Sequence, residues 1–357
     1  MSWRSKLRGD VLGGIAGGLI VAAVVWLTLP TSAPRVTPIA DRFGLAEGFE
    51  QRRDQEFAFY PQRFAVANGR EDNARRNVRL WEAGQKLRGG HAPNIPQQTG
   101  DCVSWGGANA LRIRLELKGL RADPSTMYLY GLARVVIGRN SPGCNQSGAF
   151  PSDLIDGIKT NGLITTEEAG VPYSGSEAKK WGCKGPPARL LELGRSRPCD
   201  AHPIRSTDEL VDALCNGFPC TIGSLFGVRD GSIRVRDGRQ VAEWNDRWAH
   251  QMCLCAYDGS IGQGREYVYV LNSWGHQAHP EPLQDEPPGG FWVSLKTAGR
   301  MIKDGECWAI SDVRGFDNEI DWSVFDSVAV PRQSPTIRLA RNEVHNARVP
   351  AKYTLAP

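Results

Sequence analysis

The hydrophobic pattern of the sequence changes near residue 200, and this change constrains the fold more than any other feature. Before it, residues 102–117 mix apolar residues with Ala and Gly, which predicts a buried helix, and residues 151–158 predict a second helix closed by Gly162. After it, short apolar runs between turn residues predict strands at 221–225, 253–257, 267–271 and 291–295. A helical half followed by a sheet half predicts an α+β fold with two lobes and a cleft between them. The second lobe would be an antiparallel, barrel-like sheet.

Length and composition indicate a globular protein, and the charge pattern argues against a nucleic-acid-binding protein. The chain has 357 residues, of which 41% are hydrophobic and 23% charged, so it is long enough to bury a large core. Lys and Arg number 43 against 39 Asp and Glu, and the basic residues are scattered along the chain. The sequence therefore has no cluster of basic residues of the kind that binds nucleic acid.

The N-terminus predicts a membrane segment. Basic residues within the first eight positions precede an uncharged apolar stretch, residues 11–30. That is about the ~20 residues that a spanning helix needs, and the basic flank is expected to stay cytoplasmic. A cleaved signal peptide is the alternative, because small residues at 31–33 fit a cleavage site, although Pro34 follows directly. We favour the anchor, which puts the rest of the chain outside the cytoplasm; cleavage would make it secreted or periplasmic.

Nine cysteines fit such a compartment. In an oxidising environment eight of them would form four disulfides and leave one free thiol. The sequence alone does not give the pairing.

Two residues far apart in the chain have the character of a nucleophile and its base. Cys102 stands at the start of the predicted helix 102–117, where the helix N-terminus and a nearby imidazolium would lower the pKa of its thiol. His250 stands beside a predicted strand much later in the chain, as expected when two lobes each supply one catalytic group. The histidines at 91, 202, 276, 279 and 345 have no comparable context.

An amide and a tryptophan complete the candidate site. Asn272 follows the predicted strand 267–271, and its side-chain oxygen would accept the imidazole N–H of His250 and fix its tautomer. Trp274 would shield that bond from water. Gln97 or Gln98, with the Cys102 backbone N–H, would form an oxyanion hole, and only one of the two is needed.

Metal binding is the competing interpretation of His250. Together with Cys253 and Cys255 it gives three potential zinc ligands, but no fourth ligand is evident in the sequence. We therefore expect neither a metal nor a cofactor.

Taken together, these blocks resemble the signature blocks of papain-like cysteine peptidases (clan CA). The blocks are Gln97-x-x-Gly100-Asp101-Cys102-x-Ser104-Trp105, His250, and Asn272-Ser273-Trp274-Gly275. The segment Gly143-Cys144-Asn145 with Gly148 is similar to the family's Gly-Cys-Asn-Gly-Gly segment, whose glycines lie along the substrate backbone. The resemblance covers roughly residues 94–315.

Two positions depart from the family pattern. Thr99 stands where the family usually has a cysteine, and Val103 stands where it has a tryptophan. Cys144 therefore needs another partner than in the family, and we expect Cys183.

The resemblance implies a papain-like two-lobed fold and a cysteine-type peptidase. Cys102 would form a thioester acyl-enzyme with a peptide or protein substrate, His250 would protonate the leaving amine, and Asn272 would orient His250. Gly148 would border the substrate. A thiol amidase or transpeptidase on the same fold is an alternative, as is a catalytically silent binding module. Every catalytic position is filled, which argues against the silent module. The oligomeric state is not predicted.

Four regions follow from these assignments. Residues 1–33 are the anchor or signal segment, and 34–93 are a linker with either a pro-region or a brace, including an amphipathic helix at 73–87. Residues 94–325 form the catalytic domain, and 326–357 form a polar C-terminal tail.

Overall fold

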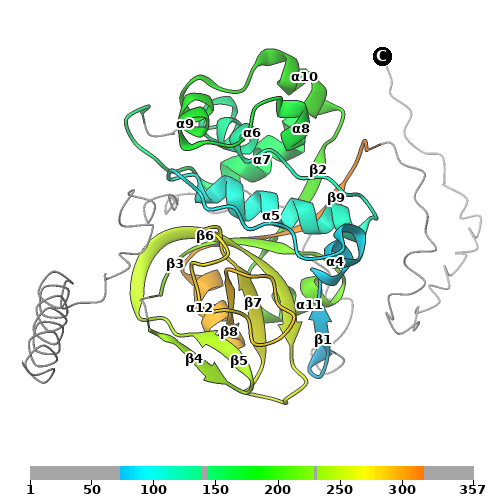
Figure 1. Ribbon diagram of the computed structural model, residues 1–357, viewed down its shortest axis with the longest axis vertical. Helices are drawn as coiled ribbons and strands as arrows, with labels where there is room; N and C mark the ends of the chain where they lie inside the picture. Colours follow the sequence, from blue (N-terminus) through cyan, green and yellow to red (C-terminus); the bar gives the residue numbers. More distant parts are fainter. Residues whose placement is uncertain (1–72, 139–142, 229–230, 317–357) are drawn as a thin grey trace, which may run out of the picture. The chain divides into compact units, whose positions relative to one another are not determined.

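The computed structural model describes residues 73–138, 143–228 and 231–316 (Figure 1). The predicted anchor or signal segment, the first part of the linker and the C-terminal tail lie outside these residues. Among the helices of the described part, none has both the length and the apolar character needed to cross a membrane.

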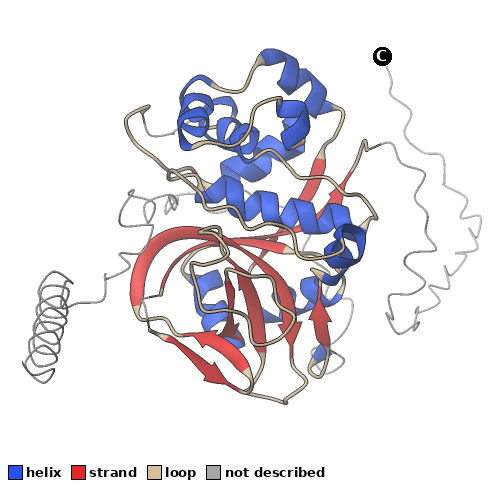
Figure 2. Ribbon diagram, in the orientation of Figure 1, coloured by secondary structure: helices blue, strands red, loops and turns tan. Residues whose placement is uncertain are grey.

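Helices dominate the first half of the described chain and strands the second half, as predicted (Figure 2). The helical elements are α4 (Glu82–Arg88), α5 (Cys102–Leu117), α6 (Thr126–Gly131), the π-helix η1 (Leu132–Val136), α7 (Pro151–Asn161), α8 (Thr166–Ala169), α9 (Gly175–Lys184), α10 (Ala188–Arg195), α11 (Thr207–Cys215) and α12 (Leu295–Lys303). The two helices predicted at 102–117 and from residue 151 are confirmed as α5 and α7, and α7 ends at Gly162 as expected. Within the sheet half, α11 and α12 were not predicted.

The strands form one sheet. They are β1 (Asn77–Arg79), β2 (Cys199–Ile204), β3 (Cys220–Gly227), β4 (Ile233–Arg236), β5 (Arg239–Ala242), β6 (Asp246–Asp258), β7 (Tyr267–Leu271), β8 (Gly290–Ser294) and β9 (Glu306–Val313). Their order is β2-β9-β3-β6-β7-β8-β5-β4, with β1 added to β6, and the pairs are antiparallel except β5 with β8. The expected barrel-like lobe is therefore an open sheet, because the terminal strands β2 and β4 do not pair with each other.

Helix α5 lies between the group of helices α6 to α10 and most of the sheet (Figure 1). Small residues on α5 permit this close packing. A Cβ atom at Gly106 would lie 2.9 Å from Gln251 Cγ and 3.1 Å from the Met252 backbone nitrogen, both on β6. This approach brings the first turn of α5 against the strand that carries His250.

The segment before α5 is not the single helix predicted at 73–87. Residues Asn77–Arg79 pair with β6 as β1, and only Glu82–Arg88 are helical, ending at Gly89 in the left-handed conformation (φ 72°). The strand was missed because its partner lies far along the chain. Arg88 Nε donates to Glu116 Oε1 on α5 at 2.5 Å, so the described part of this segment packs on both the sheet and α5.

The cysteines do not pair as expected. Cys144 and Cys183 form a disulfide with a Cα–Cα distance of 5.0 Å, which confirms that pairing. The other seven cysteines are free and buried, at positions 102, 199, 215, 220, 253, 255 and 307. The prediction of four disulfides is wrong, because these side chains occupy core positions as small hydrophobic groups.

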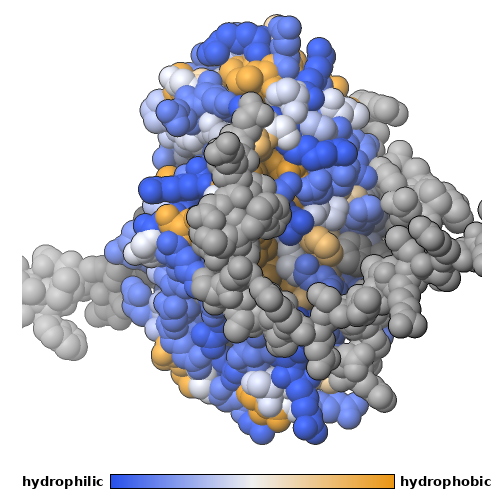
Figure 3. Space-filling model, turned by 90° about the vertical axis from the view of Figure 1, so that its right-hand side faces the viewer, coloured by the Kyte–Doolittle hydropathy of each residue, from blue (hydrophilic) through white to orange (hydrophobic). Residues whose placement is uncertain are grey.

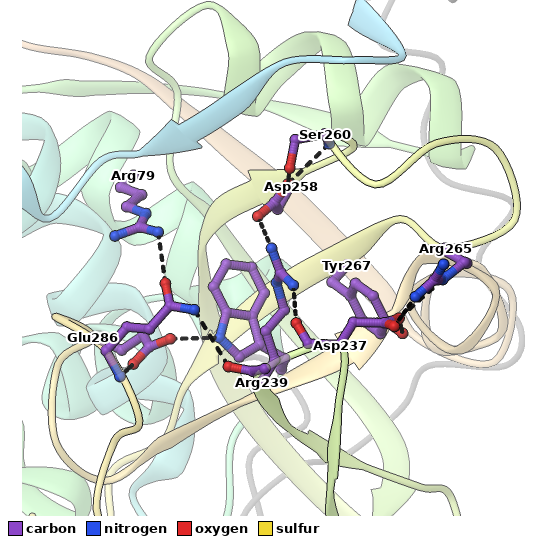
Figure 4. Close-up of polar contacts among 11 residues, drawn as sticks. Arg79, Asp237, Arg239, Asp258, Ser260, Arg265, Tyr267 and Glu286 are labelled. Carbon is purple, nitrogen blue, oxygen red and sulfur yellow. Dashed lines mark hydrogen bonds and ion pairs between the residues drawn. The ribbon is translucent and has the colours of Figure 1, made fainter.

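A group of polar contacts, which includes one buried ion pair, links three strands (Figure 4). Arg239 on β5 pairs with Asp258 at the end of β6, and the Tyr267 hydroxyl on β7 donates to Asp237 Oδ2 at 2.6 Å. Arg239 and Asp258 are both buried. Removing either partner would leave an uncompensated charge in the interior, so the pair fixes this part of the sheet.

The face shown in Figure 3 is mainly hydrophilic over the described residues, with apolar residues gathered near mid-height. Among the described residues, five large apolar side chains are well exposed: Ile95, Val135, Leu193, Val235 and Leu283. They come from separate segments, and most apolar side chains are in the core.

Candidate active site

Cys102 is the first residue of α5, as predicted, and it is buried. Burial raises the pKa of its thiol to about 12, while backbone N–H groups, that of Gln251 first, lower it and the Asp101 carboxyl raises it. The expected lowering of the thiol pKa by the helix N-terminus is therefore outweighed by burial. The hydrogen bond from Gln251 also places the thiol beside the residue that follows His250.

His250 lies within β6, opposite Ser224 of β3, and Asn272 directly follows β7. His250 Nε2 lies 2.7 Å from Asn272 Oδ1, and both residues are buried. His250 Nδ1 has no hydrogen-bond partner in the described part of the chain. Burial lowers the pKa of His250 to about 4, although the bond to Asn272 raises it. The imidazole is therefore oriented by the hydrogen bond at Nε2, while Nδ1 makes no hydrogen bond within the described residues.

Trp274 covers this hydrogen bond. Its ring lies 4.8 Å from the His250 ring, centroid to centroid, with an interplanar angle of 30°. Trp248 packs against Trp274 at 5.4 Å. The indole is buried, and it packs directly on the imidazole that contacts Asn272.

The two candidate glutamines differ in their surroundings. Gln97 is buried: its Nε2 donates to the Thr99 carbonyl at 3.0 Å, and its Oε1 accepts from Ser273 Oγ at 2.5 Å. Gln98 is exposed, and its Oε1 accepts from the Gly175 backbone N–H of α9 at 3.0 Å. Only Gln97 is tied to the Asn272 segment.

Gly148 lies against the segment that carries Cys102. Its N–H donates to the Gly100 carbonyl at 3.0 Å, and its positive φ of 106° favours glycine. A Cβ atom at Gly100 would lie 2.5 Å from Ser147 Cβ, so this contact is close. These contacts place Gly148 beside the residues that precede Cys102.

Asp101 is a site residue whose role the sequence did not reveal. It precedes Cys102, is buried, and accepts a hydrogen bond from the Tyr173 hydroxyl at 3.0 Å. Burial raises the pKa of Asp101 to about 7, although that hydrogen bond lowers it. Near pH 7 the Asp101 carboxyl group is therefore partly protonated, and it lies next to Cys102 in the chain.

His279 is the second residue that the sequence missed. It lies in the polar loop 276–290, and its Nε2 is 2.9 Å from Asn272 Nδ2. The ring is edge-on to Phe291 at 4.9 Å. The only sequence signal was its position a few residues after the Asn272 block.

The cysteines near His250 do not form a metal site with it. In the residues that the structure describes, no group of three or more His, Cys, Asp or Glu side chains is arranged to hold a metal ion. Cys253 and Cys255 are buried in the core on β6.

The sequence matches no protein-family model and no curated protein. Among solved structures it is similar to xylellain, a cysteine protease from Xylella fastidiosa, at 18% identity and a TM-score of 0.54, covering 76% of this chain and 98% of that one. Digestive procathepsin L 3 from the larval midgut of Tenebrio molitor gives 14% identity and a TM-score of 0.47, covering 76% and 78%. The cysteine protease and lectin-like domains of Cwp84 from Clostridium difficile give 18% and 0.46, covering 72% and 53%. The similarity to xylellain, together with the helical and sheet halves described above, shows that this chain has a papain-like α+β fold.

Proposed function

We propose that the chain is a cysteine peptidase that hydrolyses peptide bonds with Cys102, His250 and Asn272. One observation carries the proposal. His250 is held by Asn272 through Nε2, its Nδ1 is unpartnered within the described chain, and the Cys102 thiol accepts a hydrogen bond from the adjacent Gln251. These contacts support the assignment of Cys102 as nucleophile, His250 as base and Asn272 as the group that orients the base.

The reaction begins with proton transfer from the Cys102 thiol to His250 Nδ1. Burial disfavours each charge alone, since it raises the pKa of the thiol and lowers that of the imidazole. Forming both charges together lets the thiolate and imidazolium stabilise each other, as in coupled titrations. The thiolate then attacks the peptide carbonyl.

Oxyanion stabilisation is assigned to the Cys102 backbone N–H and the Gln97 side chain. Gln97 is buried and its side chain is hydrogen-bonded to Ser273, whereas the side-chain oxygen of the exposed Gln98 accepts a hydrogen bond from α9. Donors fixed in advance are effective because they need no reorganisation when charge develops. We therefore assign the role to Gln97 and not to Gln98.

Breakdown of the intermediate needs an acid and then a base. The His250 imidazolium gives its proton to the leaving amine, which leaves a thioester on Cys102. His250 then activates a water molecule that hydrolyses the thioester. Asn272 keeps the ring in place during both steps, and Trp274 limits access of water to their hydrogen bond.

The substrate class is a peptide or protein, bound along the segment that includes Gly148. We also propose that the domain works outside the cytoplasm, held by the apolar stretch 11–30. Support for this location comes from the sequence alone.

Labelling with an epoxide-type thiol inhibitor tests the proposed function. The purified chain should be modified on Cys102, found by mass spectrometry of its peptides. Cys102→Ala should abolish labelling, and His250→Ala should slow it by at least about a hundredfold. Cys199→Ala is the matched control, because Cys199 is an equally buried thiol on β2, and its labelling should equal that of the unmodified sequence. Equal labelling of all four proteins would refute the triad.

A further inference from the structure

The loop 276–290, which the proposed mechanism does not use, carries a second histidine to the site. His279 Nε2 lies 2.9 Å from Asn272 Nδ2, on the opposite side of the carboxamide from the oxygen that contacts His250. The His279 ring also packs near Trp274, at 6.0 Å between centroids, and edge-on to Phe291. The loop is therefore in contact with the residue that orients the base.

The hydrogen-bond chemistry fixes which group donates at each step. The Ser273 backbone N–H can only donate, so the Asn272 atom 2.7 Å from it is the carbonyl oxygen Oδ1. The same oxygen accepts from His250, so His250 Nε2 carries a proton and Nδ1 is the basic nitrogen. The other Asn272 atom is then the NH₂ group, which can only donate. His279 Nε2 must accept, and a neutral ring with this nitrogen bare carries its proton on Nδ1.

The loop is held at several points, which defines where His279 lies. The Ala278 N–H donates to the Gly275 carbonyl at 3.2 Å, closing the turn before the histidine. Further on, Tyr269 OH donates to the Pro287 carbonyl at 2.5 Å and Trp292 Nε1 donates to Glu286 at 3.1 Å. Glu286 belongs to the loop, and its side chain is buried (Figure 4). These contacts come from β7 and β8, so the sheet itself holds the loop.

The surroundings of His279 favour the neutral ring that these bonds require. Desolvation and the neighbouring His250 lower the pKa of His279 to about 4. A proton on Nε2 would remove the acceptor and place a second positive charge beside the His250 imidazolium.

We propose that His279 is a positioning residue for the catalytic site: its Nε2 accepts the Asn272 N–H and thereby keeps the Asn272 carbonyl oxygen directed at His250. This role rests on the proposed peptidase function. His279 acts through Asn272, not on the substrate, so its loss should slow the chemical step and leave binding unchanged.

Nitrogen-15 NMR of histidine-labelled full-length protein tests the tautomer without any substitution. At neutral pH the His279 signals should show a protonated Nδ1 and a bare Nε2, and those of His250 a protonated Nε2. Protonation of His279 at Nε2 would overturn the proposal, because that nitrogen would then have no lone pair for Asn272.

Inactivation kinetics with the epoxide probe test the consequence. His279→Ala should lower the maximal inactivation rate constant about fivefold, as expected for one lost hydrogen bond, with no change in the inhibitor concentration for half-maximal rate. His279→Gln, which keeps an acceptor oxygen, should recover most of the rate. His276→Ala is the matched control, because His276 is exposed on the same loop, and it should behave as the unmodified sequence.

The outcomes separate this inference from the proposed function. If His250→Ala slows inactivation and His279→Ala does not, the positioning role is wrong and the peptidase assignment stands. If His250→Ala has no effect, the peptidase assignment is wrong and the role of His279 falls with it.

Discussion

On the sheet side of the site, hydrogen bonds join His250 and His279 to Asn272; on the helix side, burial raises the pKa values of two adjacent acids, Asp101 and Cys102. The sheet wall comprises His250, Asn272, Trp274 and His279, in which Asn272 is bound by His250, Ser273 and His279. The helix wall comprises residues 97–104, in which Asp101 and Cys102 both have raised pKa values because of burial.

The difference indicates a division of roles between the walls. The sheet wall holds a neutral imidazole in one orientation, with Nδ1 as its open position. On the helix wall, burial raises the pKa of both acids, to about 7 for the Asp101 carboxyl and to about 12 for the Cys102 thiol. In the proposed mechanism neither wall stabilises a charge by itself, so the thiolate–imidazolium pair would depend on the contact of α5 with β6.

The largest effect on stability is expected from removing the disulfide, which is present in the helical half and not in the sheet half. The helical half contains the Cys144–Cys183 disulfide, which spans 39 residues, whereas the free thiols of the sheet half are unpaired. Cys144→Ser with Cys183→Ser should lower the free energy of unfolding by about 3–4 kcal/mol, since the unfolded chain gains loop entropy. Denaturant titration monitored by circular dichroism measures the change.

Thiol counting sharpens the same comparison. Under denaturing, non-reducing conditions the purified chain should show seven free thiols, matching the seven unpaired cysteines. A single reactive thiol would mean that the sheet half is cross-linked as well.

Asp101 should make the helix wall sensitive to pH. Its folded pKa of about 7 lies above the ordinary aspartate value of 3.8, so the folded state holds the proton more tightly than the unfolded state. Stability should therefore fall as the pH rises from about 4 to about 7, by about 3 kcal/mol. Asp101→Asn should remove this fall, making the variant more stable than the unmodified sequence near pH 8 and equal to it near pH 3. Urea unfolding across that range measures the difference, and identical slopes in both proteins would contradict this account.

The glutamines give the smallest expected effect. Gln97→Ala should reduce the turnover rate by about a hundredfold, as for loss of one oxyanion donor. Gln98→Ala serves as the matched control and should retain nearly full turnover, because its side chain is bound to α9. Comparable losses in both variants would mean that the helix wall stabilises the oxyanion in another way.

Local patterns predicted most of the framework. Cys102–Leu117 was predicted with correct ends, because its apolar residues, with Ala and Gly between them, are typical of a buried helix. The strand at 267–271 was also predicted to the residue, since it is a short apolar run between turns. The hydrogen bond between His250 and Asn272 was expected from their residue types and from their places beside two predicted strands.

Features that depend on distant partners could not be predicted. β1 pairs with a strand about 180 residues later, so its local helical pattern was misleading. The odd number of cysteines suggested four disulfides and one free thiol. A disulfide also requires suitable Cα and Cβ geometry, which only the folded sheet determines. His279 has an unremarkable polar context, and only the path of the loop 276–290 brings it to Asn272.

The pH dependence of Cys102 alkylation by iodoacetamide tests the central claim most directly. If the walls cooperate, the unmodified sequence should react rapidly near neutral pH, well below the pKa of about 12 that burial gives the thiol alone. His250→Ala should react only as the pH becomes alkaline. Identical profiles for the two proteins would contradict the account, because the thiol would then ionise without the histidine.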